Sequence, residues 1–106
     1  MFDEKMVLCV ANSYEEKFYL NENFAYLPKS IKDELKIMCV LYTEEIGGIL
    51  SLEFDEEGTL EFVVRTEEND FLFDEIGSVL KIKQMREMKK DLLESLETFY
   101  KVFFLS

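Results

Sequence analysis

Apolar residues recur with two different periods along this chain, a period of two in some segments and of three to four in others. Residues 6–11 and 17–20 are rich in β-branched and aromatic side chains, and the first of these segments is apolar enough for a central strand. Residues 50–54 and 60–64 alternate apolar and polar side chains on either side of a turn at 55–58. The pattern therefore predicts two β-hairpins.

The second hairpin also has a predicted register. With the turn at 55–58, Leu52 pairs with Phe62, and the apolar side chains of both strands lie on one face. Glu53 then lies opposite Glu61 on the outer face, and we expect both carboxylates to point outward. Facing like charges are unfavourable in a sheet, so this pair calls for solvent screening, a shared cation or a basic side chain from a partner.

A period of three to four residues predicts a first helix over residues 28–46. Pro28 suits a first helical turn because it has no amide hydrogen, and the pair Gly47-Gly48 ends the helix. Apolar residues surround most of the helix circumference. We therefore expect this helix to be covered on more than one side, by the C-terminal helix or by a second subunit.

A second helical segment begins at Phe71 and continues to the end of the chain, with an apolar stripe from Met85 to Phe103. Gly77 is expected to break or kink its early part. Residues 78–83 fit either a continued helix or a fifth strand. The helix is favoured because polar, helix-forming residues follow at once.

The predicted order of elements is strand, strand, helix, strand, strand, helix. This order indicates a two-layer α+β domain over residues 1–106, with an antiparallel sheet of two hairpins and the helices packed on one face. The length of 106 residues fits a single domain, and an apolar content of 48% is enough for a core.

The two cysteines, Cys9 and Cys39, lie thirty residues apart among apolar neighbours. We expect two reduced, buried thiols, with a redox pair as the alternative. The acidic start of the chain lacks the basic segment of a signal peptide, and the apolar runs are too short to cross a membrane. We therefore expect a cytoplasmic protein.

The net charge of −11 is concentrated in the middle of the chain. Residues 44–75 carry twelve acidic residues and one basic residue, whereas residues 1–43 and 76–106 have balances of −2 and +2. Nucleic acids and anionic membranes need a basic surface, so neither is an expected partner. The acidic residues either keep the protein in solution or dock on a basic partner. The candidate acidic docking surface consists of Glu53, Asp55, Glu56, Glu57, Glu61, Glu67, Glu68 and Asp70.

The residue types that carry much enzyme chemistry are missing from this sequence. It has no histidine, which removes the usual general base and the imidazole metal ligand. It has no glycine-rich phosphate-binding motif, and the acidic turn at 55–58 lacks the ligand spacing of an EF-hand. We therefore predict no enzymatic activity, no catalytic residues, no cofactor and no metal site.

The chain as a whole, and residues 5–20, 27–50 and 70–80 in particular, resembles a family of short uncharacterised bacterial proteins that form a domain of unknown function. The resemblance implies a bacterial cytoplasmic protein and no particular activity. The order of elements also resembles that of longin and roadblock modules, which are protein-binding platforms. It departs from theirs because a fifth strand is not favoured here.

These observations predict a non-catalytic protein–protein interaction module that self-associates, as a homodimer through its helices, or binds another protein not identified by the sequence. An acidic adaptor or inhibitor that binds a basic macromolecular surface is the first alternative, and a small-ligand or cation-binding protein is the second. Salt separates the first two functions, because hydrophobic self-association persists in salt whereas acidic docking weakens.

Overall fold

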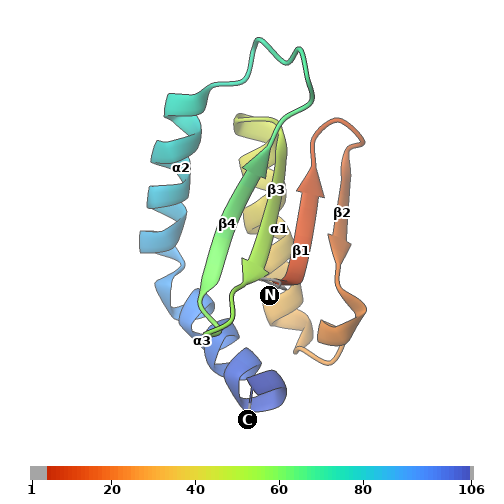
Figure 1. Cartoon of the computed structure of the whole chain (residues 1–106), viewed down its shortest axis with the longest axis vertical. Coiled ribbons are helices and arrows are strands. Elements are labelled where there is room, and N and C mark those ends of the chain that lie inside the picture. Colours follow the sequence, from red (N-terminus) through yellow and green to blue (C-terminus); the bar gives the residue numbers. More distant parts are fainter. Residues whose placement is uncertain (1–4, 106) are drawn as a thin grey trace.

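The computed structural model describes residues 5–105, which form a four-stranded antiparallel sheet with helices on one face (Figure 1). The predicted α+β class, with two antiparallel hairpins, is confirmed. The strands are β1 (Met6–Asn12), β2 (Lys17–Leu20), β3 (Ile49–Phe54) and β4 (Leu60–Arg65). The helices are α1 (Lys29–Glu45), α2 (Glu75–Met88) and α3 (Lys90–Tyr100), with a short 3-10 helix at Glu22–Phe24 and a π-helical turn at Lys101–Leu105.

The strand order is β2-β1-β3-β4, so the pairing of β1 with β3 joins the two hairpins into one sheet. The predicted register of the second hairpin is confirmed, since Leu52 pairs with Phe62 and the two neighbouring glutamates face each other. Gly58 closes the turn at a φ of +84°, which a residue with a β-carbon rarely adopts. The Asp55 carboxylate accepts hydrogen bonds from two backbone amides of the same turn. Local sequence therefore fixes this hairpin.

Helix α1 lies behind the sheet in the view of Figure 1 and supplies the other half of the core. It begins directly after Pro28, and it ends before Gly47, whose φ of +97° reverses the chain. Its buried side chains are Leu35, Met38, Cys39 and Tyr42. They pack against a buried layer of the sheet that consists of Leu8, Cys9, Ala11, Leu50, Leu52, Phe54 and Leu60.

The C-terminal part of the chain forms two helices that are separated at Lys89, where φ is −112° and ψ is 24°. The predicted break at Gly77 is therefore wrong. Gly77 lies in the first turn of α2, and its amide donates to the capping carboxylate of Asp74. Residues 78–83 are helical, which confirms the favoured alternative.

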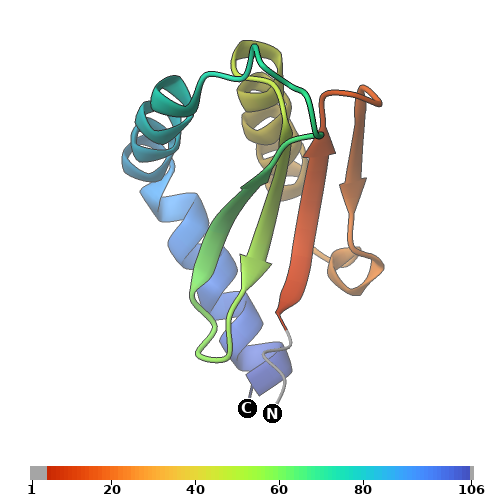
Figure 2. The same ribbon diagram turned by 45° about the horizontal axis from the view of Figure 1, so that its top comes forward.

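The break at Lys89 changes which side chains of the predicted apolar stripe reach the core. Met85 and Leu96 are buried, whereas Met88 and Phe103 are 71% and 68% exposed. Helix α2 lies beside α1 and beyond β4, and α3 continues along the end of the sheet near the β3–β4 turn (Figures 1 and 2). A straight helix would keep the whole stripe on one side, and the break removes that constraint.

Aromatic rings attach α3 to the sheet. The rings of Phe54 and Tyr100 are stacked with centroids 4.2 Å apart, and Phe24 of the 3-10 helix lies 5.7 Å from Phe54. Phe104 packs on both Phe24 and Tyr100. Aromatic pairs of this kind contribute about 0.5–1.5 kcal/mol each beyond the burial of their area, so the cluster fixes the position of α3.

The opposite face of the sheet is not covered by any helix of residues 5–105 (Figure 2). Glu53 lies on this face, as predicted, but it is only 6% exposed, so the prediction that it points into solvent is wrong. Strands flank β3 on both sides, and the Glu53 carboxylate accepts a hydrogen bond of 2.7 Å from Ser51 and lies 3.5 Å from the guanidinium of Arg65. Glu61, on the edge strand β4, is more exposed and binds Lys5 at 2.7 Å.

Candidate functional site

The acidic residues proposed as a docking surface are spread over three places rather than gathered in one. Asp55, Glu56 and Glu57 lie in the β3–β4 turn at one end of the sheet. Glu67, Glu68 and Asp70 lie in the loop between β4 and α2 at the other end (Figure 1). Strands of six residues separate the two groups by roughly 20 Å, and Glu53 and Glu61 lie between them on the open face.

Several of these carboxylates already bind groups of their own chain. In addition to the contacts of Glu53, Asp55 and Glu61 described above, Asp70 accepts a hydrogen bond of 2.5 Å from the Tyr14 hydroxyl. This bond raises the pKa of Tyr14 above its ordinary value of 10.0. The Tyr14 oxygen also accepts from the Glu67 amide, so the acidic loop is tied to the first hairpin. A basic partner would compete with these internal contacts.

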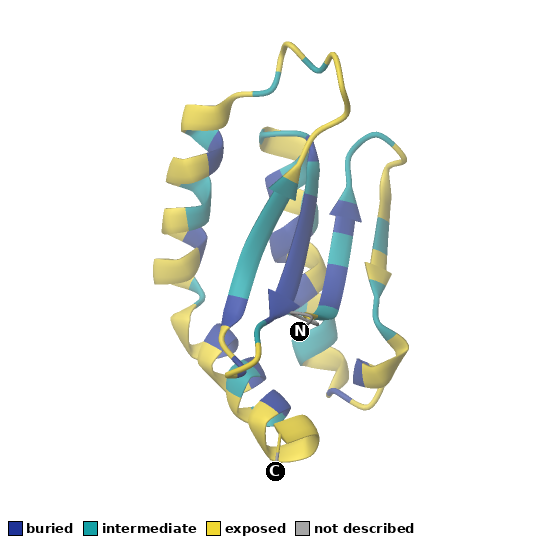
Figure 3. Ribbon diagram, in the orientation of Figure 1, coloured by how far each residue is buried: buried dark blue, intermediate teal, exposed yellow. Residues whose placement is uncertain are grey.

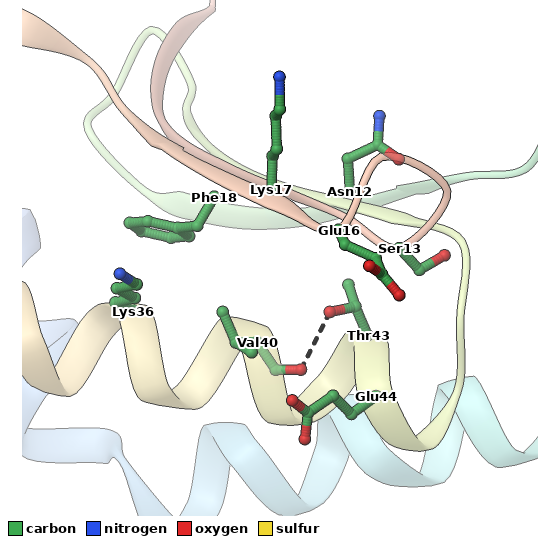
Figure 4. A pocket seen from close by; sticks show the side chains of 9 residues that line it. All are labelled: Asn12, Ser13, Glu16, Lys17, Phe18, Lys36, Val40, Thr43 and Glu44. Atoms are coloured by element: carbon green, nitrogen blue, oxygen red, sulfur yellow. Dashed lines mark hydrogen bonds between the residues drawn. The ribbon is translucent and has the colours of Figure 1, made fainter.

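A cleft of about 700 Å³ lies between α1 and the first hairpin (Figure 4). Phe18 and Val40 form its apolar part, Lys36 lies at one end, and Glu16 and Glu44 lie at the other. The cleft thus has carboxylates at one end and an ammonium group at the other, beside the apolar side chains of Phe18 and Val40, while the Lys17 side chain points away from the cleft. In residues 5–105, no group of three or more acidic or cysteine side chains is placed to hold a metal ion.

The two cysteines are brought together by the fold. The sulfur atoms of Cys9 in β1 and Cys39 in α1 lie 3.9 Å apart, both are buried, and both are free thiols, as predicted. The hydrogen bond to Cys39 and the burial of the thiol raise the pKa of Cys9 well above its ordinary value of 9.0. Because a thiolate is the reactive form of cysteine, the raised pKa makes Cys9 a poor nucleophile at neutral pH, and both buried side chains pack in the core.

Large apolar side chains are exposed together at the start of α2. We call this surface the α2 patch, and its members are between 61% and 95% exposed. Three of them follow the spacing i, i+3 and i+4 of one helix face, and two precede the helix in the loop, in a region that Figure 3 shows as largely exposed. The α2 patch consists of Phe71, Leu72, Ile76, Val79 and Leu80.

The α2 patch is exposed because the other side of α2 holds the helix against the protein. Ser78 forms a buried hydrogen bond of 2.6 Å with Tyr42 of α1, and Met85 is buried. Salt bridges of 2.8 Å and 3.0 Å, from Lys81 to Glu45 and from Lys89 to Glu34, also join α2 and its end to α1. Helix α2 is therefore fixed in place with an apolar surface turned outward.

One family model covers nearly the whole chain: the model of a family of unknown function, DUF6145, matches residues 5–106. The chain belongs to this family. Searches of curated proteins and of solved structures give no significant match. The resemblance to a domain of unknown function is thus confirmed, and DUF6145 membership assigns no activity. No helix among residues 5–105 is both long and apolar enough to span a membrane.

The α2 patch of this DUF6145 member was not predicted from the sequence, although a signal was present. Ile76 precedes Met85 by nine residues, which is two and a half helical turns. The two side chains therefore lie on opposite sides of a helix. Apolar residues opposite an established core stripe indicate a second contact surface, and this periodicity was the available clue.

Proposed function

We propose that this member of DUF6145 is a non-catalytic protein–protein interaction module of the bacterial cytoplasm, and that the α2 patch is its contact surface. The observation that carries the proposal is the clustering of five large, exposed apolar side chains on one fixed helix and the loop that leads into it. Single exposed apolar residues are normal on protein surfaces, whereas five large ones within residues 71–80 indicate an interaction site.

The energy of covering the α2 patch supports this function. Full burial of one Leu, Ile, Val or Phe side chain contributes about 1.5–3 kcal/mol. Five such side chains that start largely exposed can therefore supply several kcal/mol toward association, even after ordering costs are subtracted. The salt bridges and the buried hydroxyl pair that hold α2 keep the surface preorganised for a partner.

An acidic adaptor function has less support. Its candidate residues lie at two ends of the sheet and on the face between them, and several of the carboxylates are engaged with groups of the same chain. The buried Glu53 presents little of its charge to a partner. The acidic residues more readily account for solubility than for one docking surface.

A photoreactive amino acid tests the proposed contact surface in living cells that express the protein at its native level. It is placed at Leu72, which is 95% exposed in the α2 patch, and separately at Tyr26, which is 94% exposed but lies outside the patch. Illumination should give a protein adduct from position 72 and none from position 26. Equal capture at both positions, or no adduct at 72, would contradict the proposal.

A further inference from the structure

Two opposite charges lie on either side of Val79, one of the three helical members of the α2 patch, at equal distances along the helix. Glu75 lies four residues before Val79, and Lys83 lies four residues after it, so each is roughly 6 Å from Val79 along the axis. Both side chains are exposed, and neither forms a salt bridge with another residue of the described chain. This spacing leaves one negative and one positive charge available on either side of Val79.

Because of this arrangement, we propose that the partner of the α2 patch is the same patch of a second copy. The two α2 helices lie antiparallel about a two-fold axis that passes close to Val79. The inference rests on the proposed function, since it names the partner of the same surface. A two-fold contact requires a surface that complements itself, and the spacing around Val79 meets that requirement.

The symmetry places each charge opposite its complement. With the axis at Val79, Glu75 of one copy lies beside Lys83 of the other, and the second copy repeats the pair. Antiparallel helices also bring opposite ends of their dipoles together. Each of these electrostatic contacts is attractive although the whole chain carries −11.

The size of the α2 patch matches one half of an ordinary dimer interface. Such an interface buries about 800 Å² from each partner, of which a little over half is apolar. The burial free energies of the five side chains correspond to an apolar area on the order of 400 Å². The surrounding polar residues of α2 and of the preceding loop supply the rest of the area as a polar rim.

Charge reversal in the full chain tests the two-fold arrangement by sedimentation equilibrium. We expect the natural sequence to form a dimer at tens of micromolar. Glu75→Lys alone, or Lys83→Glu alone, places like charges at both symmetric positions and should weaken the dimer about tenfold. The variant with both changes should recover the original affinity. An equimolar mixture of the two single variants should form a heterodimer more readily than either forms a homodimer.

Cysteine cross-linking tests the position of the axis. Two copies of a Val79→Cys variant should be joined by a disulfide under mild oxidation, because position 79 meets itself at a two-fold axis. The matched control is Ser95→Cys in α3, an exposed site away from the α2 patch, which should remain uncoupled. The natural cysteines are buried and should not contribute.

The outcomes separate this inference from the proposed function. A chain that stays monomeric at about 100 µM while position 72 captures a different protein would overturn the two-fold pairing and leave the interaction module standing. A dimer whose affinity is the same in the single and double charge variants would also overturn the pairing. A monomer with no adduct at position 72 would overturn both.

Discussion

The hydroxyl groups of Tyr42 and Ser78 meet between α1 and α2, 2.6 Å apart and both buried. Ser78→Ala removes the partner of the Tyr42 hydroxyl, and a buried polar group without a partner costs about 1–3 kcal/mol. Tyr42→Phe should cost less, because the Ser78 hydroxyl can turn to the backbone carbonyl of Asp74, the capping residue of its helix. We expect losses of about 2–3 kcal/mol for the first change and about 1 kcal/mol for the second.

The double variant should be more stable than Ser78→Ala alone, because Tyr42→Phe removes the unsatisfied hydroxyl together with its partner. The resulting coupling between the two positions should be about 1–2 kcal/mol. Urea denaturation measures all four proteins, and the comparison is valid if the slope of free energy against urea is unchanged.

A spectroscopic titration gives an independent readout of the same contact. Burial raises the pKa of Tyr42 above its ordinary value of 10.0, and the hydrogen bond from Ser78 lowers it. Ser78→Ala should therefore move the ionisation of Tyr42 to higher pH. Additive losses in the double variant, or a Tyr42 titration that does not change, would refute this account of how α2 is held.

Three further predictions concern the backbone, the thiols and α3. In thermal denaturation, Gly48→Ala should lower the free energy of unfolding by about 2–4 kcal/mol, because φ is +71° and the added β-carbon would lie 2.9 Å from a ring carbon of Phe73. Gly47→Ala, whose β-carbon would have nothing within 4 Å, should lower it by only about 1 kcal/mol. The free energy of unfolding should fall as pH rises above about 9, because the pKa of Cys9 is raised in the folded protein and the thiol therefore loses its proton first in the unfolded chain. Denaturant titrations at several pH values should show a weaker dependence of the free energy of unfolding on pH in Cys9→Ala. Glu97→Ala should lower the free energy of unfolding by about 1–3 kcal/mol and speed hydrogen exchange at the Leu60 amide, because that amide donates to the Glu97 carboxylate at 2.7 Å. Glu97→Gln, which keeps an acceptor oxygen, should preserve most of the protection from exchange.

The second hairpin could be predicted down to its register because the information is local. Alternating side chains on two strands and a glycine in the turn allow one pairing that puts every apolar residue on one face. The burial of Glu53 could not be predicted, because it depends on β1 being the other neighbour of β3. That neighbour comes from a segment about forty residues earlier in the chain.

The break at Lys89 was missed for a related reason. Lys89 is a good helix former, and the sequence around it has neither glycine nor proline. The break instead lies between two helices that pack against different parts of the protein. Helix α2 is held to α1 through Tyr42, and α3 is held to the sheet through Tyr100. The α2 patch lies on the helix before this break, where periodicity alone marked a second apolar face.

The pairing of β1 with β3 orders events during synthesis of the chain. Each hairpin forms from neighbouring residues, but the β1–β3 pairs, which run from Met6 with Phe54 to Asn12 with Ile49, cannot form until α1 has been made. Until then, the emerging first hairpin has an unpaired strand edge that another chain can join. The time that the ribosome needs to synthesise residues 29–54 therefore sets how long the edge of β1 can pair with a strand of another chain.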